Sequence, residues 1–96
     1  MKLVYAEQAV ADLVRLRNFI SETNPSAAAR VAHELIARIE YLRDFPDMGR
    51  AVAQAPEPQV VRDAVLGKYI VRYTAHAEAV VILRIWHHFE EREQSP

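Results

Sequence analysis

The chain has 96 residues, no cysteine, and 12 basic against 13 acidic side chains, which gives a formal net charge of −1. This length suits one domain with a single core, and without cysteine neither a disulfide nor a thiolate-based zinc site can form. Proteins that hold nucleic acid by its phosphates usually carry a clear basic surplus, so we expect no direct sequence-specific nucleic acid binding. No apolar run could cross a bilayer, and the first residues lack the regions of a secretory signal. We therefore expect a cytoplasmic protein without membrane contact, cofactor or metal, since no His, Asp and Glu grouping has ligand spacing.

The N-terminal half predicts a short strand followed by a helical hairpin. Residues 3–5 are apolar and indicate an edge strand, and apolar residues then recur with helical spacing over about 7–22, with Asp12 on the solvent side. Asn24-Pro25 ends this helix and begins a second one over about 25–44, because Asn favours the N-cap and Pro favours the first helical position. So short a connection predicts two antiparallel helices.

Strands are predicted in the C-terminal half, where β-branched and aromatic residues gather, over about 59–65, 69–74 and 80–87. A tight turn at Leu66–Lys68 and a looser one over Thr74–Glu78 predict antiparallel neighbours. The expected fold class is α+β with the order β-α-α-β-β-β, in which the N-terminal helical hairpin packs on one face of a mostly antiparallel sheet.

A single domain over 1–96 is expected, without internal repeats or a boundary. Its parts are the helical hairpin over about 7–44, the antiparallel strands over 59–88, and an acidic tail over 89–96.

Successive side chains of a strand point to opposite faces of the sheet, and this alternation along the last two strands predicts which face lies against the helices. The apolar and aromatic set is expected under the helices: Tyr69, Val71, Tyr73, Val81, Leu83 and Ile85. The other side mixes apolar and cationic side chains and is expected to be free for a partner: Ile70, Arg72, Thr74, Val80, Ile82, Arg84 and Trp86. Arg72 and Arg84 would be cross-strand neighbours there, and adjacent like charges favour an acidic partner.

The order and spacing of several short motifs resemble the RelE/ParE superfamily of toxins from type II toxin–antitoxin systems. The motifs cover nearly the whole chain: Ala11–Leu13, Asn24–Ala28, Leu42–Arg50, Val61-Arg62, Tyr69–Tyr73 and Ile82–His87. The resemblance implies a growth-inhibiting bacterial toxin that stabilises a plasmid or chromosome. It also implies a cognate antitoxin that neutralises the toxin with an acidic, amphipathic C-terminal segment. RelE-like members cleave mRNA in the ribosomal A site, whereas ParE-like members inhibit DNA gyrase.

Two departures from the RelE-like pattern favour a ParE-like toxin. RelE-like nucleases typically carry an arginine after the first tyrosine of the third strand, where this chain has Ile70. They also carry several cations on the second strand, where it has only Arg62, followed by Asp63. The preferred interpretation is therefore a gyrase inhibitor without catalytic residues. Its contacts with antitoxin or target would be made by Ile70, Arg72, Ile82, Arg84 and Trp86.

Two alternatives stay open at this stage. In a RelE-like, metal-independent endoribonuclease, Arg62 and Arg84 would stabilise the phosphate and the His87 imidazole would serve as acid or base. The last alternative is a degenerate toxin that binds its antitoxin and has lost its activity.

Overall fold

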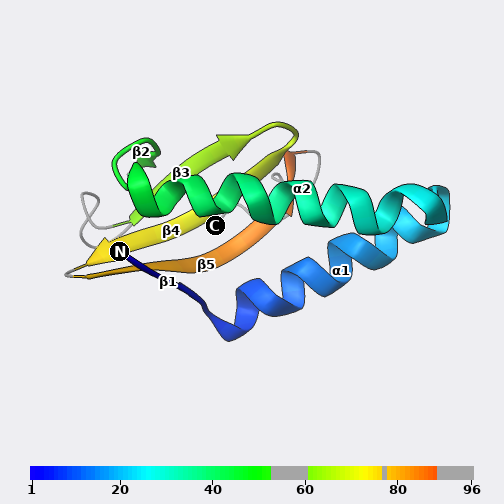
Figure 1. Cartoon of the computed structure of the whole chain (residues 1–96), viewed down its shortest axis with the longest axis horizontal. Coiled ribbons are helices and arrows are strands. Elements are labelled where there is room, and N and C mark those ends of the chain that lie inside the picture. Colours follow the sequence, from blue (N-terminus) through cyan, green and yellow to red (C-terminus); the bar gives the residue numbers. More distant parts are fainter. Residues whose placement is uncertain (53–60, 77, 89–96) are drawn as a thin grey trace.

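The computed structural model describes residues 1–52, 61–76 and 78–88 of the chain. The elements follow in the order β1 Lys2–Tyr5, α1 Glu7–Thr23, α2 Pro25–Asp44, β2 Arg50–Ala51, β3 Val61–Leu66, β4 Tyr69–His76 and β5 Ala79–His87 (Figure 1). The five-stranded sheet has the order β1-β5-β4-β3-β2, with β1 parallel to β5 and all other neighbours antiparallel.

The predicted α+β class is confirmed, with β2 as one short strand beyond the predicted order. This two-residue strand was not predicted from the sequence. Predictions for 53–60 and for the acidic tail from 89 on fall outside the described residues.

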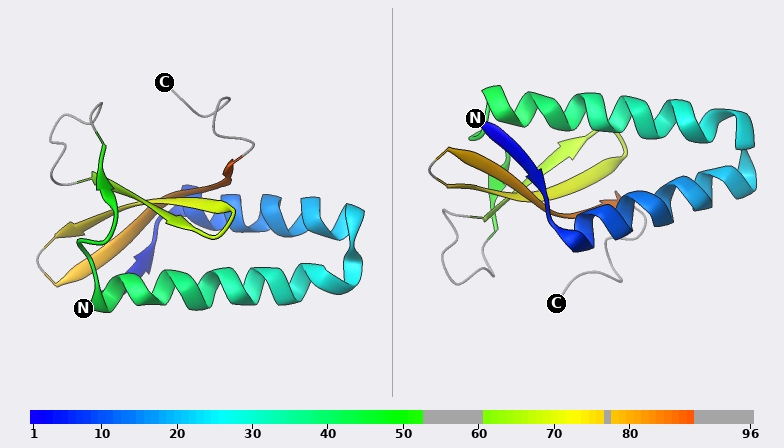
Figure 2. Two further views of the ribbon diagram at one scale, coloured as in Figure 1. Left: turned by 90° about the horizontal axis from the view of Figure 1, so that it is seen from above. Right: turned by 60° about the horizontal axis from the view of Figure 1, so that its bottom comes forward.

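Both helices form as predicted and lie antiparallel on one side of the sheet (Figure 2). Their joined ends extend beyond the sheet (Figure 1). The junction follows from local chemistry, because Asn24 Oδ1 accepts a hydrogen bond from the Ala27 N–H at 3.3 Å and Pro25 occupies the first turn. None of the described helices is long and apolar enough to span a membrane.

Replacing Asn24 by Ala is expected to lower the free energy of unfolding by about 1 kcal/mol, because the first turn of α2 then loses its side-chain acceptor. Thermal unfolding of the purified chain measures this change. Asn24→Asp keeps an acceptor at the same position and should stay close to the wild type. Equal losses for the two variants would show that the cap does not stabilise α2.

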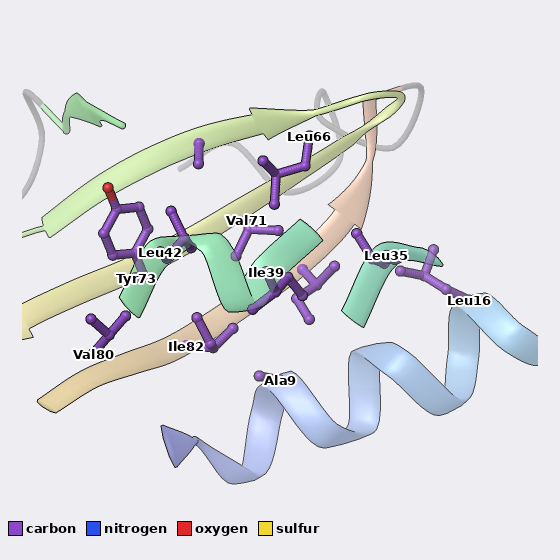
Figure 3. Packing of buried hydrophobic residues seen from close by; sticks show 12 residues of the cluster. Ala9, Leu16, Leu35, Ile39, Leu42, Leu66, Val71, Tyr73, Val80 and Ile82 are labelled. Atoms are coloured by element: carbon purple, nitrogen blue, oxygen red, sulfur yellow. The ribbon is translucent and has the colours of Figure 1, made fainter. Parts of the chain in front are cut away.

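The core lies between the helical hairpin and one face of the sheet (Figure 3). Its largest fully buried side chains come from α2 and the last two strands: Ile39, Leu42, Val71, Tyr73, Val80, Ile82 and Ile85. Tyr69 is partly buried against this cluster. The predicted inward side of β4 is therefore confirmed.

A β-bulge in β5 overturns part of the predicted face assignment. Arg72 pairs with Arg84 but the next residue, Tyr73, pairs with Ile82, so Leu83 is an extra residue in β5. The extra residue reverses the alternation, and Val80 and Ile82 face the helices with no exposed surface. The predicted inward positions of Val81 and Leu83 were wrong, and so were the predicted free positions of Val80 and Ile82.

Candidate functional site

Ile82 lies in the core under the helices, and the other four residues predicted to bind a partner lie in two cross-strand rows of the sheet. The first row joins Val65, Ile70 and Trp86, and the second joins Asp63, Arg72 and Arg84. Ile70 and Trp86 are buried, with 7% and 4% of their surface exposed, although neither belongs to the core under the helices. Val65, in contrast, is 70% exposed.

Arg72 is held by groups of its own chain. Its Nε and Nη2 atoms donate to the two carboxylate oxygens of Asp63 at 2.9 and 3.0 Å, and its guanidinium carbon lies 5.2 Å from the centre of the Trp86 ring. The hydrogen bonds with Asp63 raise the pKa of Arg72, so the cation is retained despite partial burial. The Arg72 charge is thus already balanced within the sheet.

Arg84 is also paired, with a carboxylate that the sequence pattern placed on the solvent side. Asp12 of α1 is only 3% exposed, and it accepts from Arg84 Nε at 2.8 Å and from Arg84 Nη2 at 3.2 Å. It also accepts from the backbone N–H of Ile85 at 2.8 Å, while Arg15 Nη2 donates to the Ile85 carbonyl at 3.1 Å. The prediction of a solvated Asp12 was wrong.

The position of Asp12 at the sheet edge explains its burial. β1 pairs with β5 only as far as Tyr5 opposite Ile82, so no described strand lies beside Ile85 on that side. Asp12 and Arg15 supply the acceptor and donor that a neighbouring strand would supply. A signal was present in the sequence, since Asp12 stands at helical spacing between the buried Ala9 and Leu16.

Arg62, the remaining predicted cation of the nuclease alternative, anchors the loop before β2. Its Nη1 donates to the Gly49 carbonyl at 2.7 Å, and its Nη2 lies 3.8 Å from Asp47 Oδ1. The buried Tyr73 hydroxyl holds the same loop, because it accepts from the Gly49 N–H at 2.9 Å and donates to the Pro46 carbonyl at 2.7 Å.

The structure does not bring Arg62, Arg84 and His87 together. Arg62 lies opposite Tyr73 of β4, and His87 lies opposite Tyr69 of the same strand. Four residues separate Tyr73 from Tyr69, which corresponds to roughly 13 Å along the strand at about 3.3 Å per residue. Arg84 is bound to Asp12. The His87 ring meets the Tyr69 ring edge-on, with the ring centres 5.4 Å apart.

A groove of about 470 Å³ runs between the overhanging part of the helical hairpin and the β3–β4 turn. Its walls are formed by α1, α2 and the ends of β3, β4 and β5: Leu16, Phe19, Ile20, Val31, Glu34, Leu35, Arg38, Leu66, Gly67, Lys68, Tyr69 and His87. The apolar part is continuous with the core, and Phe19 on the rim is 60% exposed. Sequence reasoning did not identify this groove, because its walls are far apart in the chain.

No group of three or more His, Asp or Glu side chains is placed to hold a metal ion within residues 1–52, 61–76 and 78–88.

Comparison with known proteins assigns this arrangement to one superfamily. The sequence model of a family described as "ParE toxin of type II toxin-antitoxin system, parDE" matches residues 3–92. Toxin RelE3 of Caulobacter vibrioides is 36% identical over 81 residues, which cover 84% of this chain and 87% of the relative. Toxin RelE2 of the same organism is 34% identical over 86 residues, covering 90% and 93%.

Two solved structures have the same fold at low sequence identity. The chromosomal ParDE system of P. aeruginosa matches with a TM-score of 0.77 at 20% identity, over 91% of this chain and 95% of that one. The RelB–RelE antitoxin–toxin complex of Methanococcus jannaschii matches with a TM-score of 0.60 at 12% identity, over 97% and 99%.

Proposed function

Because the chain belongs to the ParE toxin family of type II toxin–antitoxin systems, we propose that it inhibits growth by binding DNA gyrase and that a cognate antitoxin neutralises it. The antitoxin partner is supported by the two structural neighbours, which are a ParDE system and a RelB–RelE antitoxin–toxin complex. Both encounters are proposed to take place in the cytoplasm, and neither needs a cofactor.

A non-catalytic mode of action is supported by the ion pairs that Arg72 and Arg84 form within the chain. Metal-free RNA cleavage requires a cation that faces the scissile phosphate, together with a base and an acid. Here Arg72 is bidentate to Asp63 and Arg84 to Asp12, so neither guanidinium faces an incoming phosphate without a competing carboxylate. A toxin that binds a protein target needs no such phosphate site.

A second candidate function is ribosome-dependent mRNA cleavage of the RelE type. It is favoured by the names of the Caulobacter relatives, which are called RelE toxins. It is also favoured by the His87 imidazole, which lies beside Tyr69 on the groove that also holds Lys68. In this candidate His87 would act as acid or base, and Arg62 and Arg84 would have to leave their present partners.

Purified chain added to a gyrase supercoiling reaction is expected to stop supercoiling and to leave cleaved DNA bound to the enzyme. In a translation reaction with ribosomes and mRNA, primer extension should find no new mRNA ends. Cells that express the chain without its antitoxin should filament and induce the DNA-damage response.

His87→Ala separates the two candidates, with the exposed His33 replaced by Ala as its matched control. The proposed gyrase inhibitor keeps its activity in both variants. New mRNA ends that vanish only in His87→Ala would establish the RelE-type function instead. Normal growth, unaffected gyrase and intact mRNA would mean that the chain is a degenerate toxin that only binds its antitoxin.

A further inference from the structure

One side of α1 carries a stripe of exposed side chains that contribute neither to the core nor to the ion pairs of the sheet. The stripe consists of Glu7, Val10, Val14 and Arg17, which recur at i, i+3, i+7 and i+10 and so share one side of the helix. Val10 and Val14 are 48% and 55% exposed. Two large apolar side chains therefore face solvent in the middle of this stripe.

The stripe continues into a groove that is formed by the two helices alone. Val14 and Arg17 line this groove of about 360 Å³, together with Ala29, His33 and Ile36 of α2 among others. Ile36 is 39% exposed, so the exposed apolar surface extends from α1 onto α2. A contiguous apolar surface of this kind marks an interaction site, whereas single exposed apolar residues are ordinary.

The two ends of the stripe carry opposite charges. Glu7 lies in the first turn of α1, and Arg17 follows ten residues later, which corresponds to about 15 Å at about 1.5 Å per residue. Within residues 1–52, 61–76 and 78–88, neither side chain forms an ion pair. Both charges are therefore available to groups from outside the chain.

The stripe is complementary to itself when a second copy of it runs in the opposite direction. With Val10 of one copy opposite Val14 of the other, Glu7 lies opposite Arg17 of the other copy, because both pairs are centred on position 12. A twofold axis at that position repeats each contact, so two Glu–Arg pairs enclose two valine contacts. We propose that α1 pairs antiparallel with α1 of a second copy of this chain through the stripe.

The charges at both ends identify a second copy as the occupant. An acidic segment would place a like charge opposite Glu7, and a basic segment would do the same opposite Arg17, whereas a second copy matches both ends. The contact spans little more than one helix face, so we expect a weak dimer with a dissociation constant of roughly 10–100 μM. The inference depends neither on gyrase nor on the antitoxin.

The test measures the mass of the purified full chain by sedimentation velocity over a concentration series at low salt. Arg17→Glu and Glu7→Arg each bring like charges together twice and should weaken the dimer at least about tenfold. An equimolar mixture of the two variants should dimerise like the wild type, because one copy then presents only acidic groups and the other only cations. Circular dichroism and thermal unfolding establish that each variant is folded.

The apolar centre of the stripe is tested by Val14→Glu, which places a charge opposite Val10 and should weaken the dimer at least about tenfold. Val65→Glu is the matched control, because Val65 is 70% exposed and lies on β3 instead of the stripe. Arg50→Glu, at an exposed position of β2, is the control for Arg17→Glu. Both controls should keep the dissociation constant within about twofold of the wild type.

Disulfide cross-linking reports the register, because the chain has no cysteine of its own. A mixture of Val10→Cys and Val14→Cys should give a disulfide-linked dimer that contains one copy of each variant. Each variant alone should cross-link less, since identical positions are offset by four residues, about 6 Å along the helices.

A chain that stays monomeric up to about 1 mM would overturn the inference. A dimer that Val14→Glu and Val65→Glu weaken equally would also overturn it, as would the failure of Arg17→Glu and Glu7→Arg to complement each other. If the chain stays monomeric and Val14→Glu abolishes gyrase inhibition, the stripe contacts the target and the inference is wrong. If the wild-type chain dimerises through the stripe without affecting gyrase, the inference holds and only the proposed target is wrong.

Discussion

Asp12→Ala is expected to lower the free energy of unfolding by about 2–4 kcal/mol, measured by urea and thermal denaturation. The change removes the acceptor of the Ile85 N–H and takes the Asp12 carboxylate away from the partly buried Arg84 guanidinium. The estimate stays below the roughly 3–5 kcal/mol typical of a fully buried pair, because the Arg84 side chain is 35% exposed. The melting temperature should fall by about 4–8 °C for each kcal/mol.

Asp12→Asn is the matched control, because the amide keeps the size of the side chain and can still accept from the Ile85 N–H. It should lose less stability than Asp12→Ala, and the difference between them measures packing and backbone satisfaction apart from charge. If Asp12→Ala unfolds within about 0.5 kcal/mol of the wild type, as surface substitutions do, then the link between α1 and β5 contributes no stability.

The lowered pKa of the Asp12 carboxyl group allows a prediction of how the stability of the protein depends on pH. Burial by itself would raise the pKa of Asp12, but hydrogen bonds from Arg84, the Ile85 N–H and Arg15 outweigh it and hold the pKa below its usual range. A carboxyl whose folded pKa is lowered stabilises the fold at pH values above its unfolded pKa of about 3.9. This stabilisation is lost as the pH falls through the folded value. The wild-type melting temperature should therefore drop more steeply in acid than that of Asp12→Asn.

Tyr73→Ala is expected to cost about 3–5 kcal/mol of unfolding free energy, since it removes a large side chain with no exposed surface from the centre of the core. Tyr73→Phe isolates the hydroxyl group. It leaves the Gly49 N–H and the Pro46 carbonyl without their partner and should cost about 1–3 kcal/mol. Tyr41→Phe is the control, because Tyr41 is 60% exposed and its hydroxyl has no comparable role.

Hydrogen exchange at Gly49 adds a local measurement to the Tyr73 series. The Tyr73 hydroxyl is the acceptor of the Gly49 N–H, so that amide should exchange faster in Tyr73→Phe while amides in α1 keep their protection. The space there is also limited, since a Cβ at Gly49 would lie 2.8 Å from the Tyr73 hydroxyl oxygen and 2.9 Å from the Asp63 carbonyl oxygen. Unchanged exchange at Gly49 would show that Tyr73 does not hold this loop.

The arginines of the sheet contact other groups of the same chain. Arg62, Arg72 and Arg84 each bind a group of the chain itself, so they stabilise the fold whatever else they contact. The partner of Arg72 is Asp63 of β3, that of Arg62 is the Gly49 carbonyl before β2, and that of Arg84 is Asp12 of α1.

Features that depend on neighbouring residues could be predicted from the sequence. The bounds of α2 follow from the Asn24 cap, Pro25 and the apolar spacing, and the last two strands follow from β-branched and aromatic runs. Membership of the toxin superfamily also follows from the sequence, because the order of short motifs along the chain carries it.

Features that depend on distant residues were decided by the tertiary structure. The bulge at Leu83 exchanges the exposed and buried sides of β5. The residue pattern of β5 does not predict this bulge, because both sides of the strand carry apolar residues. Asp12 is buried because β1 ends opposite Ile82 and leaves an edge whose backbone groups need a donor and an acceptor from α1. The helical pattern alone predicts a solvated carboxylate, because two of the partners of Asp12, Arg84 and the Ile85 N–H, lie at the other end of the chain.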